Sequence, residues 1–188
     1  MTSRERDRKA TLRTRLRAGR RGAVMPEMVD EVLSAVAAFG VSAGGTVCAY
    51  VASAAEPGSL AMVEALRSHG VRVLLPVVVG DGLDWAVYDG RLRVGAFGLR
   101  EPEGPLLGAE AVGSAALVLV PALAVDHSGV RLGKGGGYYD RALGSAAGPV
   151  VAVVRDEEFV PSLPVEPHDV RVDAVLTPGR GLVRLPSA

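Results

Sequence analysis

DHSGVRLGKGGGYYDR, residues 126 to 141, is the stretch around which this sequence of 188 residues is organised. Five of its sixteen residues are glycine, which adopts positive φ angles easily and lets a ligand approach the main chain. Backbone N–H groups that point into one concavity, with Arg131 and Lys134 beside them, suit an anion. A helix is predicted to start at Tyr138, and the start of a helix also attracts phosphate. The pattern predicts a phosphate-binding loop, although the glycines alone also fit a tight structural turn.

The well-known phosphate loops do not fit this stretch. A P-loop needs glycine, four residues, Gly-Lys and then Ser or Thr, whereas Gly129 and Gly133 enclose three residues and Gly135 follows Lys134. The dinucleotide fingerprint fails as well, because Tyr138 stands where its third glycine is expected. The loop therefore belongs to neither of these two classes.

Apolar runs elsewhere in the chain indicate the fold class. Near-continuous apolar segments are typical of strands in a sheet that is covered on both faces. Helical segments at Pro26–Phe39 and Ser59–His69 alternate with them, and 83–88 is predicted to be a more exposed strand. We predict one α/β domain spanning residues 1–188, a three-layer α/β/α, Rossmann-like fold with a mainly parallel sheet. The buried strands are expected at 46–52, 71–78, 115–120, 149–154 and 172–176.

Composition narrows the function classes. The 21 basic residues equal the 21 acidic ones, and a general nucleic-acid binder would need a basic excess. No apolar run reaches the ~18 residues of a membrane span, and the basic N-terminus lacks the apolar core of a secretory signal. The single cysteine, Cys48, lies in an apolar run and is predicted to be a buried core thiol. We expect a cytoplasmic, monomeric protein without nucleic-acid or membrane partners.

The N-terminal segment is strongly basic. Residues 3–20 predict a helix on which Lys9, Leu12, Arg13 and Leu16 recur at spacings of three and four and share one side. Only two of the 21 basic residues are lysines, Lys9 and Lys134, and a lysine offers a compact, rotatable ammonium that arginine lacks. A solvated basic helix and a helix whose Lys9 and Arg13 reach the phosphates of a nucleotide both fit this pattern.

Three carboxylates stand out by position. Glu56 follows the first predicted strand, at the rim where open α/β sheets bind ligands, although a solvated loop glutamate fits equally well. Asp126 is interpreted as a structural residue that fixes the glycine loop by hydrogen bonds. Asp173 falls within the last predicted strand, and a buried carboxylate must be paired or bind a cation.

GVRLGKGGGYYDR, residues 129–141, closely resembles the signature of the 5-formyltetrahydrofolate cyclo-ligase (methenyltetrahydrofolate synthetase) family. Lys9-Ala-Thr-Leu-Arg13 and the segment 98–102 resemble further stretches of that family. The resemblance implies an enzyme that uses ATP and Mg²⁺ to convert 5-formyltetrahydrofolate to 5,10-methenyltetrahydrofolate, ADP and phosphate. ATP would phosphorylate the formyl oxygen, and the N10 atom of the folate would then attack and close the ring.

The resemblance also assigns residues. Lys134, Arg131 and Tyr138 would take part in the chemistry, and Asp140 and Asp173 would hold Mg²⁺. ATP would be bound by Lys9, Arg13, Arg131, Leu132, Gly133, Lys134, Gly135, Gly136, Gly137, Tyr138 and Tyr139. The folate would be bound by Val51, Glu56, Lys134, Gly135, Gly136, Gly137 and Tyr138. A non-catalytic relative that binds folate or nucleotide, and a transferase that uses ATP on another acceptor, remain the alternatives.

Overall fold

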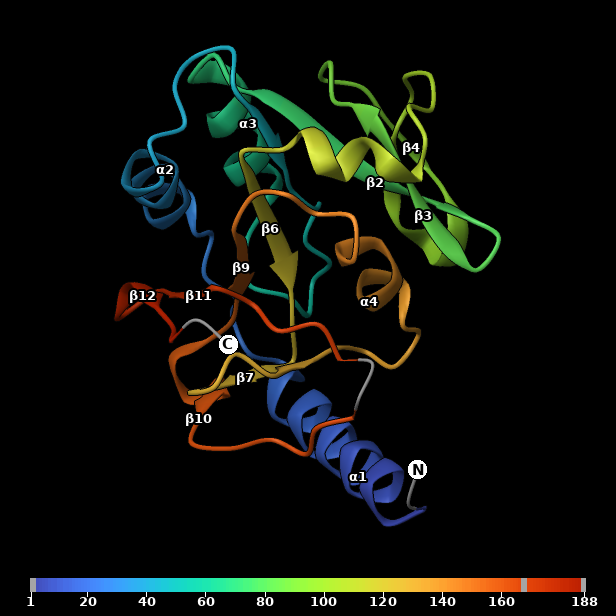
Figure 1. Cartoon of the computed structure of the whole chain (residues 1–188), viewed down its shortest axis with the longest axis vertical. Coiled ribbons are helices and arrows are strands. Elements are labelled where there is room, and N and C mark those ends of the chain that lie inside the picture. The colour runs from blue at the N-terminus through green and yellow to red at the C-terminus, as the bar shows by residue number, and fades with distance from the viewer. Residues whose placement is uncertain (1–2, 167–168, 187–188) are drawn as a thin grey trace.

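A seven-stranded sheet forms the centre of the computed structural model, which describes residues 3–166 and 169–186 (Figure 1). The strands lie in the order β12-β11-β9-β6-β1-β2-β3. The inner strands pair in parallel, and β3 and β12 pair antiparallel at the two edges. The mainly parallel sheet is therefore confirmed. The strands are β1 (Thr46–Cys48), β2 (Arg72–Val79), β3 (Gly82–Val87), β6 (Leu117–Pro121), β9 (Val150–Val153), β11 (Ala174–Thr177) and β12 (Gly181–Arg184).

Helices cover both faces of this sheet. The helices α2 (Val29–Ala38) and α3 (Leu60–Ser68) pack on one face, and α4 (Tyr138–Leu143) with the 3-10 helix η2 (Ala109–Ser114) packs on the other. Successive strand residues point to opposite faces, so Val47 joins the first of these cores and Cys48 the second. The predicted three-layer α/β/α arrangement is confirmed.

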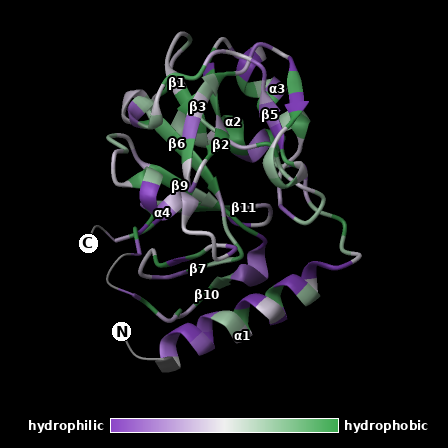
Figure 2. Cartoon of the chain, turned by 90° about the vertical axis from the view of Figure 1, so that its right-hand side faces the viewer, coloured by the Kyte–Doolittle hydropathy of each residue, from purple (hydrophilic) through white to green (hydrophobic). Residues whose placement is uncertain are grey.

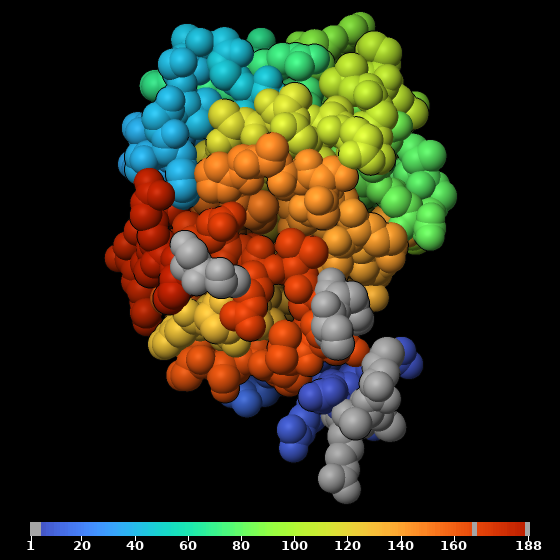
Figure 3. Space-filling model, viewed as in Figure 1, coloured from blue at the N-terminus to red at the C-terminus, as the bar shows by residue number. Residues whose placement is uncertain are grey.

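The helix α1 (Ser3–Arg20) belongs to neither layer and crosses one end of the molecule (Figures 1 and 2). It packs against a small sheet of β10 (Phe159–Val160), β7 (Ala124–Asp126) and β8 (Arg131–Leu132). Its surface is largely hydrophilic, and its apolar side chains Leu12 and Leu16 pack with Leu123, Leu132 and Leu163. The space-filling view shows the first turns of α1 extending beyond the body of the protein (Figure 3). This helix therefore projects over the edge of the sheet where the strands end.

A two-stranded hairpin of β4 (Leu92–Val94) and β5 (Arg100–Pro102) lies beside β2, with the short 3-10 helix η1 (Ala96–Gly98) at its tip. Glu101 fixes it to the sheet, because its buried carboxylate accepts a hydrogen bond from the Val78 N–H at 3.0 Å. Phe97 at the tip is 78% exposed and has a left-handed backbone conformation, with φ of 58°. A third short 3-10 helix, η3 (Asp156–Glu158), follows β9.

One expectation about the strands is confirmed and one is wrong. The segment predicted as a more exposed, alternating strand is the edge strand β3, in which half-buried residues alternate with the buried Leu83 and Trp85. Asp173 does not lie within a strand, because β11 starts at the next residue; it is exposed, and its carboxylate accepts a hydrogen bond from the Val150 N–H at 2.7 Å. It is therefore not the buried strand carboxylate that the sequence predicted.

The expectation of a buried core thiol at Cys48 is met. Cys48 is fully buried, and burial raises the pKa of its thiol to about 12. The thiol therefore stays protonated at neutral pH and is unsuited to nucleophilic chemistry. Among the described residues, none of the helices combines the length and the apolar character needed to cross a bilayer.

Candidate active site

A cleft of about 950 Å³ opens at the carboxyl ends of β1 and β6. These two strands are neighbours in the sheet. The strand order reverses between them, because β2 lies next to β1 on one side and β9 lies next to β6 on the other. Ligands of open α/β sheets bind at such a reversal of strand order. Tyr50 and Val51, which follow β1, and Pro121 and Ala122, at the end of β6, line the cleft.

The helix α1 meets the glycine loop at this cleft. The Arg13 Nε donates a hydrogen bond to the Gly133 carbonyl at 2.9 Å, and the Arg17 guanidinium donates one to the Lys134 carbonyl at 2.7 Å. Lys9, Arg13, Gly133 and Lys134 all line the cleft. The predicted convergence of two segments more than a hundred residues apart is therefore confirmed.

The loop depends on its glycines for its shape. Gly135 and Gly137 have φ angles of 104° and 69°, which side chains with a Cβ rarely adopt. Arg141 holds the loop from outside, since its guanidinium donates to the Gly136 carbonyl at 2.9 Å and lies over the Tyr138 ring. Gly133, Gly135, Gly136 and Gly137 line the cleft, and because they have no side chains they present their main chain to it. Tyr138 and Tyr139, at the start of α4, line it as well.

Lys134 and Glu56 are in direct contact. The Lys134 Nζ lies 2.8 Å from the Glu56 Oε1. The other carboxylate oxygen of Glu56 accepts hydrogen bonds from the Ser53 N–H and hydroxyl, at 2.9 and 2.8 Å. The Glu56 side chain is buried, whereas that of Lys134 is half exposed. The structure thus fixes the carboxylate in the loop after β1 and leaves the ammonium open to the cleft.

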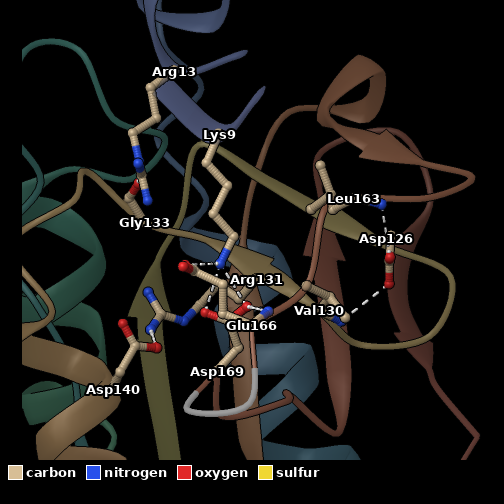
Figure 4. A network of polar contacts seen from close by, with 10 residues as sticks. All are labelled: Lys9, Arg13, Asp126, Val130, Arg131, Gly133, Asp140, Leu163, Glu166 and Asp169. Atoms are coloured by element: carbon tan, nitrogen blue, oxygen red, sulfur yellow. Dashed lines mark hydrogen bonds and ion pairs between the residues drawn. The ribbon is translucent and has the colours of Figure 1, made fainter. Parts of the chain in front are cut away.

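Lys9 is buried and paired with two carboxylates (Figure 4). Its Nζ lies 2.8 Å from a Glu166 oxygen and 2.6 Å from an Asp169 oxygen. All three residues line the cleft. Sequence reasoning placed Lys9 here but missed Glu166 and Asp169, which precede β11 in a segment without periodicity.

Arg131 and Asp140 form a second ion pair, with 2.6 Å between Nη2 and Oδ1. The Arg131 side chain is buried, lies over the Tyr139 ring at 5.8 Å, and has no hydrogen-bond partner for its Nε within the described part of the chain. Buried donors are normally satisfied, so this N–H is an exception, in a residue that lines the cleft. Asp140 is partly exposed and faces the cleft.

The structure does not bring the two predicted metal ligands, Asp140 and Asp173, into one site. Asp173 lines a different hollow, together with Phe39 and Arg184, whereas Asp140 lines the cleft. Asp169, four residues earlier, is the carboxylate that the structure brings to the cleft from this part of the chain. Within residues 3–166 and 169–186, no three His, Cys, Asp or Glu side chains are grouped closely enough to hold a metal by themselves.

Two further residues lie outside the cleft. Leu132 is buried against α1, so its side chain offers no nucleotide contact. Asp126 accepts hydrogen bonds from the N–H groups of Ser128, Val130 and Leu163, which confirms its structural role (Figure 4).

Two tyrosines of the cleft are unusually weak acids. Burial, with the nearby charge of Glu56 as the second cause, raises the pKa of Tyr50 and Tyr139 far above its ordinary value. Their hydroxyl groups therefore stay neutral at physiological pH. The Tyr50 hydroxyl donates to the Pro57 carbonyl at 2.6 Å, which holds the loop that carries Glu56.

Comparison with known proteins agrees with this geometry. The sequence profile of the 5-formyltetrahydrofolate cyclo-ligase family matches residues 5–178. A 5-formyltetrahydrofolate cyclo-ligase of Mycolicibacterium smegmatis is 48% identical over 94% of this chain and 97% of its own length. One of Escherichia coli K12 is 29% identical over 72% of this chain and 79% of its own length.

Solved structures are similar as well. The 5,10-methenyltetrahydrofolate synthetase of Aquifex aeolicus superposes with a TM-score of 0.77 at 26% identity, over 96% of this chain and 94% of that chain. The synthetase of Mycoplasma pneumoniae, at 18% identity and a TM-score of 0.65, shares the fold over 89% of this chain and 96% of its own. A full-length match in sequence, supported by the same fold, shows that the chain belongs to the 5-formyltetrahydrofolate cyclo-ligase family.

Proposed function

We propose that this protein is a 5-formyltetrahydrofolate cyclo-ligase, which uses ATP and Mg²⁺ to form 5,10-methenyltetrahydrofolate, ADP and phosphate. One observation carries the proposal. The contact between Lys134 of the glycine loop and Glu56 of the loop after β1 joins a phosphate-binding element to the rim of the sheet within one cleft. Two substrates that must react with each other need such a shared site.

The nucleotide side is formed by α1 and the glycine loop. The cations Arg13, Arg131 and Lys134 line it, together with the main chain of residues 133–137. Arg131 supports this role, since its unpaired Nε is a buried donor at the cleft. Lys9 is engaged with Glu166 and Asp169, so it reaches phosphate only if another cation, such as Mg²⁺, neutralises those carboxylates in its place. Charge neutralisation is the main protein contribution to phosphoryl transfer.

In the first step, the γ-phosphoryl group moves from ATP to the formyl oxygen, so a P–O bond forms there and ADP leaves. In the second step, N10 attacks the formyl carbon, the C–O bond to phosphate breaks, phosphate leaves, and N10 loses its proton. The Lys134 ammonium would stabilise the charge on the transferring group, because it is the exposed cation beside the carboxylate rim. Tyr138 either packs on the pterin or donates a hydrogen bond to it.

The carboxylates of the cleft fit Mg²⁺. This ion prefers six oxygen ligands and keeps several waters, so it needs only one or two carboxylates beside the phosphates of a nucleotide. Asp140 and Asp169 would hold it, in place of the predicted pair with Asp173, because both line the cleft and both carry oxygens that a cation now neutralises. Bound Mg²⁺ would neutralise charge on the phosphates.

The folate side lies at the other part of the cleft. Val51 and Glu56 from the loop after β1 line it, and apolar side chains of the sheet and the hairpin tip extend it. These apolar residues are Val78, Leu83, Phe97 and Leu99. Ligand pockets typically combine such apolar walls with a few fixed polar groups, which here are Glu56 and Lys134.

The test is a spectrophotometric assay. Purified protein with 5-formyltetrahydrofolate, ATP and Mg²⁺ is expected to produce the absorbance of the methenyl product and one ADP per product. Omission of ATP, or chelation of Mg²⁺, serves as the control. Calorimetric binding of the folate without ADP release would point to a non-catalytic relative, and ATP turnover on another acceptor would point to a different transferase.

We also propose that residues 1–188 act as a single domain and that the protein is a cytoplasmic monomer. One continuous sheet, whose strand ends border the cleft, supports the single domain. Sedimentation analysis tests the monomer, and a concentration-independent dimer would contradict it.

A further inference from the structure

Arg20, the last residue of α1, is a buried cation whose hydrogen bonds join several segments. Its side chain donates to both oxygens of Glu158, from Nε at 2.7 Å and from Nη2 at 2.6 Å. It also donates to the Ala55 carbonyl from Nη1 at 3.0 Å and to the Ala122 carbonyl from Nη2 at 2.6 Å. Arg20 is only 3% exposed and does not line the cleft. Its guanidinium therefore links α1, the loop after β1, the segment after β6 and η3.

Three of these segments build the cleft. The helix α1 carries Lys9 and Arg13 into it, Ala55 directly precedes Glu56, and Ala122 lines it. Apart from Ala122, the residues that accept hydrogen bonds from Arg20 do not line the cleft. Arg20 sets instead how far the cationic side of α1 lies from the loop that carries Glu56.

The anchor of Arg20 is rigid. Glu158 is fully buried and accepts two more hydrogen bonds from Arg155, from its backbone N–H at 2.9 Å and from its Nε at 3.0 Å. Burial alone raises the pKa of Glu158, but the hydrogen bonds from Arg20 and Arg155 outweigh it and leave the pKa below its ordinary value. The carboxylate therefore stays charged, and the planar guanidinium holds one orientation.

We propose that Arg20 is a positioning residue for the cyclo-ligase reaction. It holds the nucleotide-binding side of α1 at a fixed position relative to the folate-binding loop that carries Glu56. This inference rests on the proposed function. A buried ion pair alone would stabilise the fold without further use, but the two bonds to Ala55 and Ala122 connect the pair to main chain on both sides of the cleft. Lysine cannot replace the planar, forked guanidinium of Arg20, because a single ammonium cannot reach Glu158 and both carbonyl groups at the same time.

The test compares Arg20→Lys with Arg155→Lys. Arg155 binds the same carboxylate, and within the described part of the chain its side chain bonds to Glu157 and Glu158 rather than to the cleft segments. A misplacement of reacting groups by about 1 Å can cost ~10²-fold in rate, so Arg20→Lys is expected to lower kcat at saturating substrates by at least ~10-fold. Arg155→Lys is expected to leave kcat within about twofold. Both are assayed well below their melting temperatures, and equal kcat losses in the two variants would overturn the proposal.

A double variant separates the positioning role of Arg20 from its contribution to the stability of the fold. Replacing a buried ion pair with apolar residues of similar size often restores stability, so Arg20→Met with Glu158→Met is expected to regain much of the melting temperature that Arg20→Met alone loses. It lacks the bonds to the Ala55 and Ala122 carbonyls, so kcat is expected to stay low. Recovery of both quantities would show that Arg20 is purely structural and would overturn the proposal.

Amide hydrogen exchange gives a readout that needs no activity. Arg20→Lys is expected to raise exchange in residues 53–58 and in the second half of α1, and Arg155→Lys is not. An inactive wild-type protein would refute the proposed function, whereas unchanged exchange in Arg20→Lys would refute the positioning role. The two failures are therefore distinguishable.

Discussion

Lys134→Ala is expected to remove activity while leaving the fold almost unchanged. Lys134 is half exposed and paired with a buried Glu56. Its loss does not orphan that carboxylate, because Glu56 keeps the two hydrogen bonds from Ser53. The variant therefore separates the role of the ammonium in the reaction from its role in stability.

The two costs differ in size. Ion pairs with an exposed partner contribute roughly 0.2–1 kcal/mol, which lowers the melting temperature of a protein of this size by about 2–4 °C per kcal/mol. A group that stabilises charge in the transition state is worth about 10²–10³ in kcat, or roughly 2.7–4 kcal/mol. The increase in activation free energy should exceed the loss in stability by about 2 kcal/mol or more.

The measurements are the initial rate of methenyl formation at saturating substrates and the thermal unfolding curve of the same preparation. Arg67→Ala is the matched control, because Arg67 pairs with Glu64 at 3.0 Å on the exposed side of α3, far from the cleft residues. It should show a similar change in stability and an unchanged kcat. Wild-type kcat in Lys134→Ala would remove Lys134 from the mechanism.

Three further predictions concern other parts of the molecule. Asp169→Asn should weaken the apparent affinity for Mg²⁺ in rate titrations by at least ~10-fold, and Asp173→Asn should not; equal effects would contradict the reassignment. Cys48, with a pKa of about 12, should react with a thiol reagent at pH 8 about 10³-fold more slowly in the native than in the unfolded protein, since far less thiolate is present; comparable rates would disprove its burial. Gly95→Ala would place a Cβ 2.0 Å from the Glu101 carboxylate and break its bond to β2, at a cost of about 1–3 kcal/mol; an unchanged unfolding curve would show that the hairpin adapts freely.

The sequence predicted the features that repeat along the chain. The apolar runs identified the buried strands because both faces of the sheet are covered, and the spacing of Leu12 and Leu16 identified the buried side of α1. The glycine loop was found because Gly135 and Gly137 need positive φ angles. These signals are local, so a single sequence is sufficient to detect them.

Structural features that leave no repeating pattern of apolar residues in the sequence were missed. The strands β7, β8 and β10 have two or three residues each, too few for an alternating pattern to be recognised. The bounds of the last strand were set too early, and this placed Asp173 in the sheet. Asp169 lies in a loop, and only the folded structure shows that it meets Lys9.

The location of α1 has a consequence for biosynthesis. Its ionic anchors Glu158, Glu166 and Asp169 follow their partners by 138, 157 and 160 residues. During translation the helix emerges long before these anchors and stays solvated until the chain as far as Asp169 has left the ribosome. Contacts between such distant residues form slowly, so the body of the sheet can assemble earlier. A nascent chain that ends before Glu158 would contain most of the sheet. It would lack the residues that anchor α1 at the nucleotide-binding side of the cleft.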